Sequence, residues 1–197
     1  MLKLKQVVNR VFTSNTFIVF DEDYEDCWLV DIGDYEQMID ALPEGKQVKG
    51  LLLTHSHFDH IYGINELCRN YPDCVVYTSE FGKEALLDDK INLSRYHEHP
   101  IVFEGKHLMI VSEGNEISLF GNTKVKVIQT PGHDPGCLTY FTDSYIFTGD
   151  SYIPGVKVVT KLPRGNKIQA AKSLERIHSL AENKIICPGH GEMSCFQ

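Results

Sequence analysis

Residues 54–60 read Thr-His-Ser-His-Phe-Asp-His, and this stretch decides the fold because it follows an apolar run at residues 48–53. Its side chains able to bind a metal are those of His55, His57, Asp59 and His60. A continuous apolar run is typical of a strand that is covered on both faces. At strand spacing, the first two histidines lie on one side of the chain and can hold one ion together. The aspartate and the last histidine can point to a neighbouring position as the chain turns into a helix.

Three further segments share one arrangement, in which an apolar strand is followed by a glycine-containing turn and one residue able to bind a metal. They are residues 125–130 before Pro131-Gly132-His133, residues 145–148 before Gly149-Asp150, and residues 185–187 before Pro188-Gly189-His190. Glycine turns at strand ends allow a rigid scaffold to aim side chains at a common point. Taken singly, each residue is more often a polar loop residue than a ligand. Together with residues 54–60, they indicate a metal centre.

Composition and charge limit the classes of protein to which the chain can belong. The 197 residues are expected to form a single domain, residues 1–197, and 42% of them are hydrophobic, which is enough to bury a core. The formal net charge of -8 argues against a nucleic-acid-binding protein. Six cysteines without a Cys-x-x-Cys pair are expected to be reduced thiols of a cytoplasmic protein. The N-terminus lacks the features of a signal peptide, and no apolar run is long enough for a membrane span.

The hydrophobic pattern predicts many short strands and a few helices. Strands are expected at residues 2–8, 15–20, 27–30, 48–53, 75–78, 116–120, 123–130, 137–141, 145–148 and 184–187, and helices at residues 34–42, 61–69, 80–86 and 166–181. Residues 88–106 are polar and mixed, and are expected to form a loop or lid in which His97-x-His99 is a surface turn. Each half of the chain ends in an apolar strand followed by a histidine. This pattern favours two stacked sheets with helices outside.

The motifs together resemble the metallo-β-lactamase superfamily. They are Thr-His-Ser-His-Phe-Asp-His at 54–60, Thr-Pro-Gly-His at 130–133, Thr-Gly-Asp at 148–150 and Pro-Gly-His-Gly at 188–191. Within the superfamily the chain most resembles the glyoxalase II (hydroxyacylglutathione hydrolase) branch, and Asp31-Ile-Gly33 resembles that family's structural Asp-x-Gly. The resemblance spans residues 31–191. It implies an α/β (α+β) fold, a four-layer αββα sandwich with the metals at one edge between the sheets.

The same resemblance implies a complete set of metal ligands. One ion is expected at His55, His57 and His133, the other at Asp59, His60 and His190, with Asp150 bridging both beside a shared water or hydroxide. Five imidazoles and two carboxylates suit two divalent ions, zinc first and iron or manganese as alternatives. Two such ions lower the pKa of a bridging water and stabilise an oxyanion. On this expectation Asp59 and Asp150 belong to the catalytic machinery as well as to the metal site.

The chain also departs from the glyoxalase II pattern. It ends six residues after Gly191, and is therefore expected to be a short form without the C-terminal helical domain that helps to hold glutathione. After Thr-Gly-Asp, residues 152–157 read Tyr-Ile-Pro-Gly-Val-Lys, unlike short relatives. Tyr152 could donate a hydrogen bond to a reacting carbonyl, although packed tyrosines are common. Lys157 could meet a substrate carboxylate, although a solvated basic loop explains it equally well.

The leading hypothesis is hydrolysis of a small acyl compound, a thioester such as a hydroxyacylglutathione. The alternatives are a persulfide dioxygenase that uses one iron and a lactonase of the same fold. A β-lactamase is not expected, because the secreted lactamases of the superfamily lack a bridging aspartate. An RNA-processing hydrolase is opposed by the acidic charge, and a purely binding protein by the complete ligand set. The expected partner is a small-molecule substrate, without nucleic acid or membrane, and the oligomeric state stays open.

Overall fold

The structure, a computed structural model that describes residues 1–195, contains two six-stranded sheets. The first sheet has the order β1-β2-β3-β4-β5-β6, with bounds Lys3–Val8, Asn15–Phe20, Asp26–Val30, Gln47–Leu52, Val75–Thr78 and Leu108–Ile110. The second has the order β12-β11-β10-β9-β8-β7, and from β7 to β12 its strands are Glu116–Phe120, Thr123–Gln129, Leu138–Phe141, Tyr145–Gly149, Ile185–Pro188 and Ser194–Cys195. The N-terminal strands form the expected antiparallel meander, and β3 to β6 run parallel.

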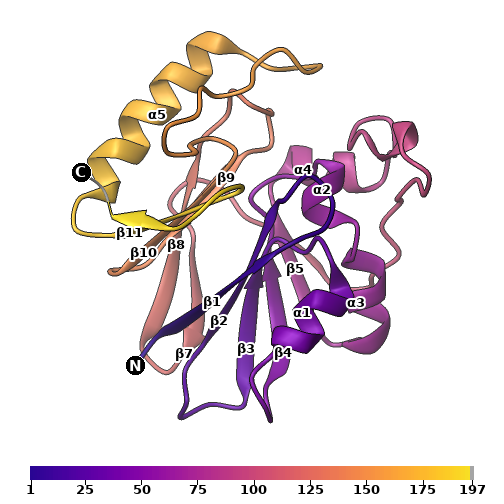
Figure 1. The fold of residues 1–197 in the computed structure, drawn as a ribbon, viewed down its shortest axis with the longest axis vertical. Helices are drawn as coiled ribbons and strands as arrows, with labels where there is room; N and C mark the ends of the chain where they lie inside the picture. Colours follow the sequence, from indigo (N-terminus) through magenta and orange to yellow (C-terminus); the bar gives the residue numbers. More distant parts are fainter. Residues whose placement is uncertain (196–197) are drawn as a thin grey trace.

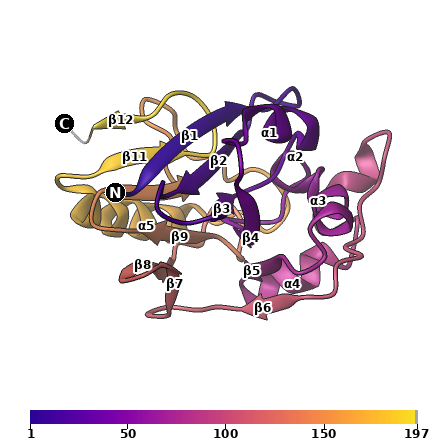
Figure 2. The same cartoon turned by 90° about the horizontal axis from the view of Figure 1, so that it is seen from below.

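Helices cover the outer faces of both sheets, which gives the predicted four-layer αββα sandwich (Figures 1 and 2). The helices over the first sheet are α1 at Tyr35–Ala41, α2 at Phe58–Ile61, α3 at Ile64–Asn70 and α4 at Glu80–Leu86. The second sheet is covered by α5 at Lys167–Ala181. In the part of the chain that the structure describes, no helix is both long and apolar enough to cross a membrane.

Side chains of the first sheet alternate between two cores. Ile18 and Leu29 point to the helices, whereas Phe17 and Trp28 on the same strands point to the second sheet. The core between the sheets is completed from the other side by Val125, Val127, Leu138, Tyr140 and Phe147. The Trp28 ring lies so close to β4 that a Cβ on Gly50 would be 2.3 Å from it. A glycine in the middle of β4 is therefore needed for this packing.

Helix α5 fixes the loop that carries His133. Asn166 caps the helix by accepting from two backbone N–H groups, and its own N–H donates to the Gly132 carbonyl at 2.7 Å. The Ser173 hydroxyl donates to the carbonyl of the preceding residue in the loop at 2.7 Å. A Cβ on Gly132 would be 2.3 Å from the backbone nitrogen of Ala170, so the loop can approach the helix only with glycine at this position.

Some elements differ from those expected from the sequence. The helix expected at residues 61–69 corresponds mainly to α3, which begins only after a break at Tyr62 and Gly63 that follows the short helix α2. A Cβ on Gly63 would meet the Gly33 carbonyl at 2.5 Å, which ties this break to the loop after β3. The segment 88–106 contains a 3-10 turn, Ser94–Tyr96, and it is followed by the unexpected short edge strand β6. The C-terminal strand β12 was also not expected.

Candidate metal centre

The seven side chains that the sequence singles out come together where strands of both sheets end. Strand β4 leads to the first four ligands, β8 leads to His133, β10 ends directly before Asp150, and β11 leads to His190. The site lies at the upper edge of the sandwich in Figure 1, between α5 and the helices of the first sheet. Side chains from the two sheets can therefore meet there, as expected for a rigid scaffold with its ligands at strand ends.

His55, His57 and His133 form the first group of three. Their ligand atoms lie within 4.8 Å of one another, and Nε2 of His133 is 2.9 Å from Nδ1 of His57. All three side chains are buried. Burial lowers the pKa of His57 to about 3 and that of His55 well below its usual value. The imidazoles of these two residues are therefore neutral at pH 7, the state in which histidine binds a metal.

Asp59, His60 and His190 form the second group, again with ligand atoms within 4.8 Å. Nε2 of His190 lies 3.2 Å from Oδ2 of Asp59, and Nε2 of His60 lies 3.5 Å from the same oxygen. In the protein without metal, these histidines and carboxylates are paired as opposite charges. Burial would lower the pKa of His190, but hydrogen bonds to Asp150 and Asp59 raise it to about 9.

Asp150 lies between the two groups, with one oxygen on each side. Its Oδ1 is 3.5 Å from Nε2 of His60 and 3.5 Å from Nε2 of His190, and its Oδ2 is 3.5 Å from Nε2 of His133. Burial would raise the pKa of Asp150, but the neighbouring imidazoles of His190 and His60 hold it well below its usual range. An ionised carboxylate in this position has the geometry of a bridging ligand.

In three of the ligand histidines, Nδ1 points away from the cluster and faces a hydrogen-bond acceptor. Nδ1 of His60 faces Asp31 Oδ2 at 2.9 Å, Nδ1 of His133 faces the Val159 carbonyl at 2.8 Å, and Nδ1 of His190 faces the Phe12 carbonyl at 3.0 Å. Each acceptor favours a proton on Nδ1. In the neutral ring Nε2 is then left with its lone pair directed into the cluster, as in protein metal sites where the outer contact sets the tautomer.

Three buried atoms of the cluster have no hydrogen-bond partner among the described residues: His55 Nε2, His60 Nε2 and Asp150 Oδ1. Buried polar atoms are rarely left unpaired, because each loses its contact with water without compensation. All three face the space where the ligand groups converge. The residues present therefore fit two divalent ions, one for each group, with nitrogen and carboxylate ligands that suit zinc, iron or manganese.

Asp31 supports the centre from outside. With His55 and His60 it forms a third set of atoms within 4.8 Å, but both of its oxygens are already engaged. Oδ1 accepts from the Thr54 N–H at 2.7 Å, and Oδ2 accepts from the Thr54 hydroxyl at 2.6 Å and faces His60. Its backbone has φ 56°, a left-handed conformation that aspartate tolerates better than most residues. We therefore assign Asp31 to positioning His60 and not to metal ligation.

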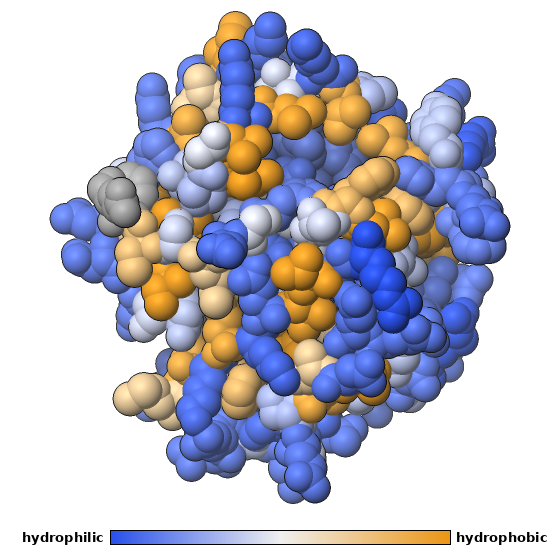
Figure 3. All heavy atoms as spheres, viewed as in Figure 1, coloured by the Kyte–Doolittle hydropathy of each residue, from blue (hydrophilic) through white to orange (hydrophobic). Residues whose placement is uncertain are grey.

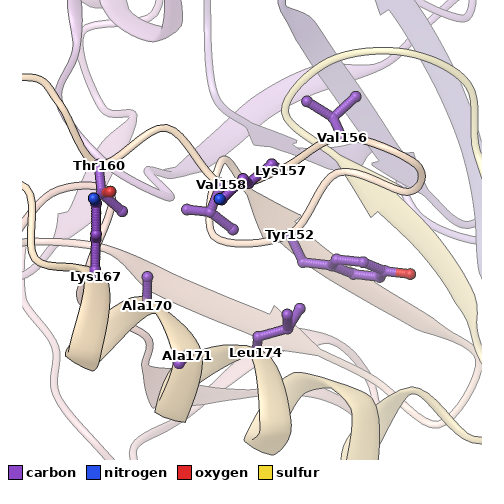
Figure 4. Close-up of a pocket in the computed structure, with 9 residues that line it drawn as sticks. All are labelled: Tyr152, Val156, Lys157, Val158, Thr160, Lys167, Ala170, Ala171 and Leu174. Atoms are coloured by element: carbon purple, nitrogen blue, oxygen red, sulfur yellow. The ribbon is translucent and has the colours of Figure 1, made fainter.

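Tyr152 and Lys157 are not brought to the cluster. Both line a separate hollow of about 370 Å³ between α5 and residues 152–160, with Val158 and Leu174 among its walls (Figure 4). The Tyr152 ring packs edge-on against His178, at 4.9 Å between ring centroids. They are not among the residues that line the hollow at the metal ligands, and their expected contact with a substrate stays a prediction.

A hollow of about 320 Å³ opens above the cluster of metal-ligand side chains. Besides ligand residues, it is lined by Phe12, Phe58, Leu93, His97, Val159 and Leu162. The sequence did not point to this wall, because its members come from separate loops without periodicity. His97 was expected on a surface turn, but its ring stacks on Phe58 with 4.0 Å between centroids.

Comparison with protein families matches residues 9–190 to the metallo-beta-lactamase superfamily, and the chain therefore belongs to this superfamily. Among solved structures, BLEG-1 B3 metallo-beta-lactamase is 27% identical with a TM-score of 0.87, over 98% of this chain and 94% of that one. TTHA1623 in a di-iron-bound form is 26% identical with a TM-score of 0.81, over 98% and 94%. ETHE1 from Myxococcus xanthus, 22% identical with a TM-score of 0.76 over 98% and 80%, shares the fold. The chain is thus a superfamily hydrolase whose His/Asp cluster fits a dinuclear metal site.

Proposed function

We propose that the protein hydrolyses a thioester of a small carboxylic acid with a hydroxide held between two divalent ions. The observation that carries this proposal is the position of Asp150, whose two carboxylate oxygens face different ligand groups. In the reaction, water oxygen bonds to the carbonyl carbon and the carbon–sulfur bond breaks. The products are a carboxylic acid and a thiol, so no oxidant or reductant is consumed.

In this proposal His55, His57 and His133 would hold one ion, Asp59, His60 and His190 would hold the other, and Asp150 would contribute to both. Two divalent ions supply an acidified water and a Lewis acid for the carbonyl oxygen. The protein's own contribution is the charge of the ligand set. Five neutral imidazoles and two carboxylates neutralise only part of the charge of two divalent ions, which favours a bound hydroxide and a developing oxyanion.

We propose zinc as the native metal because imidazole and carboxylate ligands suit it, with iron as the alternative. The di-iron form of TTHA1623, a protein 26% identical to this chain, supports iron as that alternative. We also propose a cytoplasmic setting, since all six cysteines are free thiols in the structure.

The thioester is proposed on the resemblance of the motifs to the glyoxalase II branch. A second candidate is opening of a β-lactam ring, because BLEG-1, 27% identical, is described as a B3 metallo-beta-lactamase. Persulfide oxidation and lactone hydrolysis are the remaining alternatives within this fold.

The test is a panel of substrates supplied to the protein after loading with zinc, iron or manganese. It contains S-D-lactoylglutathione, neutral thioesters, a β-lactam, a homoserine lactone and glutathione persulfide with oxygen consumption recorded. The proposal expects thioesters to be cleaved fastest and a chelator to abolish their cleavage. Faster turnover of another class, or thioester cleavage that survives complete metal removal, would overturn it.

A further inference from the structure

The hollow above the cluster of metal-ligand side chains has an apolar wall and a polar floor. The floor consists of the ligand residues, and the wall consists of the six residues Phe12, Phe58, Leu93, His97, Val159 and Leu162. No lysine or arginine within residues 1–195 lines this hollow. On the face of the molecule seen in Figure 1, hydrophobic side chains lie in patches between hydrophilic ones (Figure 3). Apolar surface that gathers around one cavity usually marks a site for an apolar ligand.

One side of the wall is aromatic and comes from three separate segments. The His97 ring stacks on Phe58 with an interplanar angle of 11°, and it meets the Phe12 ring edge-on at 5.6 Å between centroids. Phe12 lies in the loop after β1, Phe58 opens α2, and His97 follows the 3-10 turn. The three rings therefore form a continuous aromatic surface beside the metals, suited to packing against an apolar chain or ring.

Two residues of the wall have strained backbones. Phe12 has φ 52° and Leu93 has φ 68°, in the left-handed region that side chains other than glycine, asparagine and aspartate rarely adopt. Phe12 is also 62% exposed, so burial in the core does not explain why a large apolar side chain occupies this position. Strain and exposure together point to a role in contact with a ligand.

Two residues of the wall are hydrogen-bonded to metal-ligand histidines through their backbone carbonyl groups. The carbonyl of Phe12 accepts from His190, and the carbonyl of Val159 accepts from His133. Val159 is 48% exposed and Leu162 is 37% exposed, and both lie on the wall of the hollow. Because the backbone carbonyls orient ligands, the side chains of Phe12 and Val159 can be changed without removing these hydrogen bonds.

From this geometry we infer that the site selects thioesters whose acyl group is apolar and uncharged, such as hexanoyl or phenylacetyl groups, over acyl groups that carry a carboxylate. The inference rests on the proposed function and specifies its substrate class. An acyl carboxylate that packs against the apolar wall would lose water there without meeting a lysine or arginine, and burial of a charge without a partner is strongly unfavourable. The net charge of -8 adds a general repulsion of anions.

The experiment uses the metal-loaded protein and thioesters of one neutral thiol, N-acetylcysteamine, with acetyl, butyryl, hexanoyl, phenylacetyl and succinyl groups. We expect kcat/KM to rise about fourfold for each added methylene that the wall buries. Succinyl is expected to fall about tenfold or more below butyryl, a chain of similar length without the charge. A kcat/KM that is flat along the series, or highest for succinyl, overturns the inference.

Two substitutions change the wall, and a third is the matched control. Phe12→Ala should lower the hexanoyl-to-acetyl ratio of kcat/KM by about tenfold, and Val159→Lys should raise the succinyl-to-butyryl ratio. Ile168→Ala removes an equally exposed apolar side chain from α5, 71% exposed and outside this hollow, and should change neither ratio. Ratios that are identical in Phe12→Ala and Ile168→Ala overturn the inference.

A binding measurement separates failure of this inference from failure of the proposed function. Calorimetry on the metal-loaded protein compares acetate, hexanoate and succinate, and we expect hexanoate to bind at least about tenfold more tightly than acetate. If no thioester is cleaved but this preference exists and is lost in Phe12→Ala, the thioesterase proposal fails and the apolar specificity stands. Equal affinities for acetate and hexanoate overturn the specificity, whatever the protein hydrolyses.

Discussion

Replacing Asp31 by asparagine should lower the affinity of the protein for one metal ion, because it changes the tautomer of a ligand histidine. Asp31 is 2% exposed and faces three donors, the Thr54 N–H, the Thr54 hydroxyl and Nδ1 of His60. The backbone N–H of Thr54 can only donate, so the asparagine oxygen must face it. The asparagine NH₂ group then faces His60, which can pair with it only by moving its proton to Nε2. That proton would occupy the lone pair needed by the metal.

The size of the effect follows from the hydrogen bond that is lost. A buried hydrogen bond to a charged group stabilises by about 1.5–3 kcal/mol. Divided by about 1.4 kcal/mol per factor of ten, this corresponds to roughly 10–100-fold in affinity, the range seen when an outer partner of a metal-binding histidine is removed. The backbone conformation at φ 56° is not an additional penalty, because asparagine tolerates it as well as aspartate.

The assay is competition for zinc between the protein and a chromophoric chelator, which gives the number of ions and the Kd of each. Asp31→Asn should retain one ion of wild-type affinity and bind the second about 10–100-fold more weakly. The matched control is Asp21→Asn, since Asp21 is also buried but its carboxylate accepts from the N-terminus of Met1 and the backbone N–H of Asp23 and faces no metal-ligand histidine. Two ions of wild-type affinity in Asp31→Asn would refute the assigned role of Asp31.

The remaining predictions concern the bridging carboxylate, pH and the loop at α5. Asp150→Ala should lower the affinity for both ions and abolish turnover. Metal analysis after desalting measures the bound ions, and retention of two tightly bound ions would contradict the bridging role of Asp150. The pKa of His190 is raised to about 9 and that of His60 is also raised, so an ion must displace protons from this group, and its affinity should rise at least about tenfold per pH unit toward pH 9. The pKa of His57 is about 3, so the affinity for the other ion should change little with pH above neutrality. Competition with a chelator at several pH values measures both affinities. Identical pH profiles for the two ions would refute the predicted difference between them. Gly132→Ala should lower the free energy of unfolding in urea by about 1–3 kcal/mol, because the added Cβ would meet α5 and the backbone φ is 141°. Gly114→Ala is the comparison, since Gly114 has φ 81° but open space around it, and its free energy of unfolding should fall by less.

The central part of each sheet could be predicted from the sequence because its strands are apolar and bounded by turn residues. The expected strands at residues 15–20 and 75–78 agree with β2 and β5. Strand β6 escaped prediction because it is a three-residue edge strand with Met109 51% and Ile110 40% exposed, so it has no buried face to leave a pattern. Its pairing with β5 depends on a contact that only the folded chain makes.

The convergence of the seven candidate metal-ligand side chains could be predicted because all of them lie just after apolar strands. The apolar wall could not, since Phe12 and His97 are 85 residues apart and neither belongs to a periodic segment. Only the folded chain shows that the Phe12 ring meets His97 and that the Phe12 carbonyl orients His190.

The most direct test of the two-metal account is to titrate zinc into the metal-free protein while recording bound metal and neutral-thioester hydrolysis in the same samples. The account predicts little turnover after one equivalent and full turnover after two, because Asp150 and both ligand groups are needed to hold the nucleophile. Full turnover with a single ion, or no thioester hydrolysis with both ions bound, would contradict it.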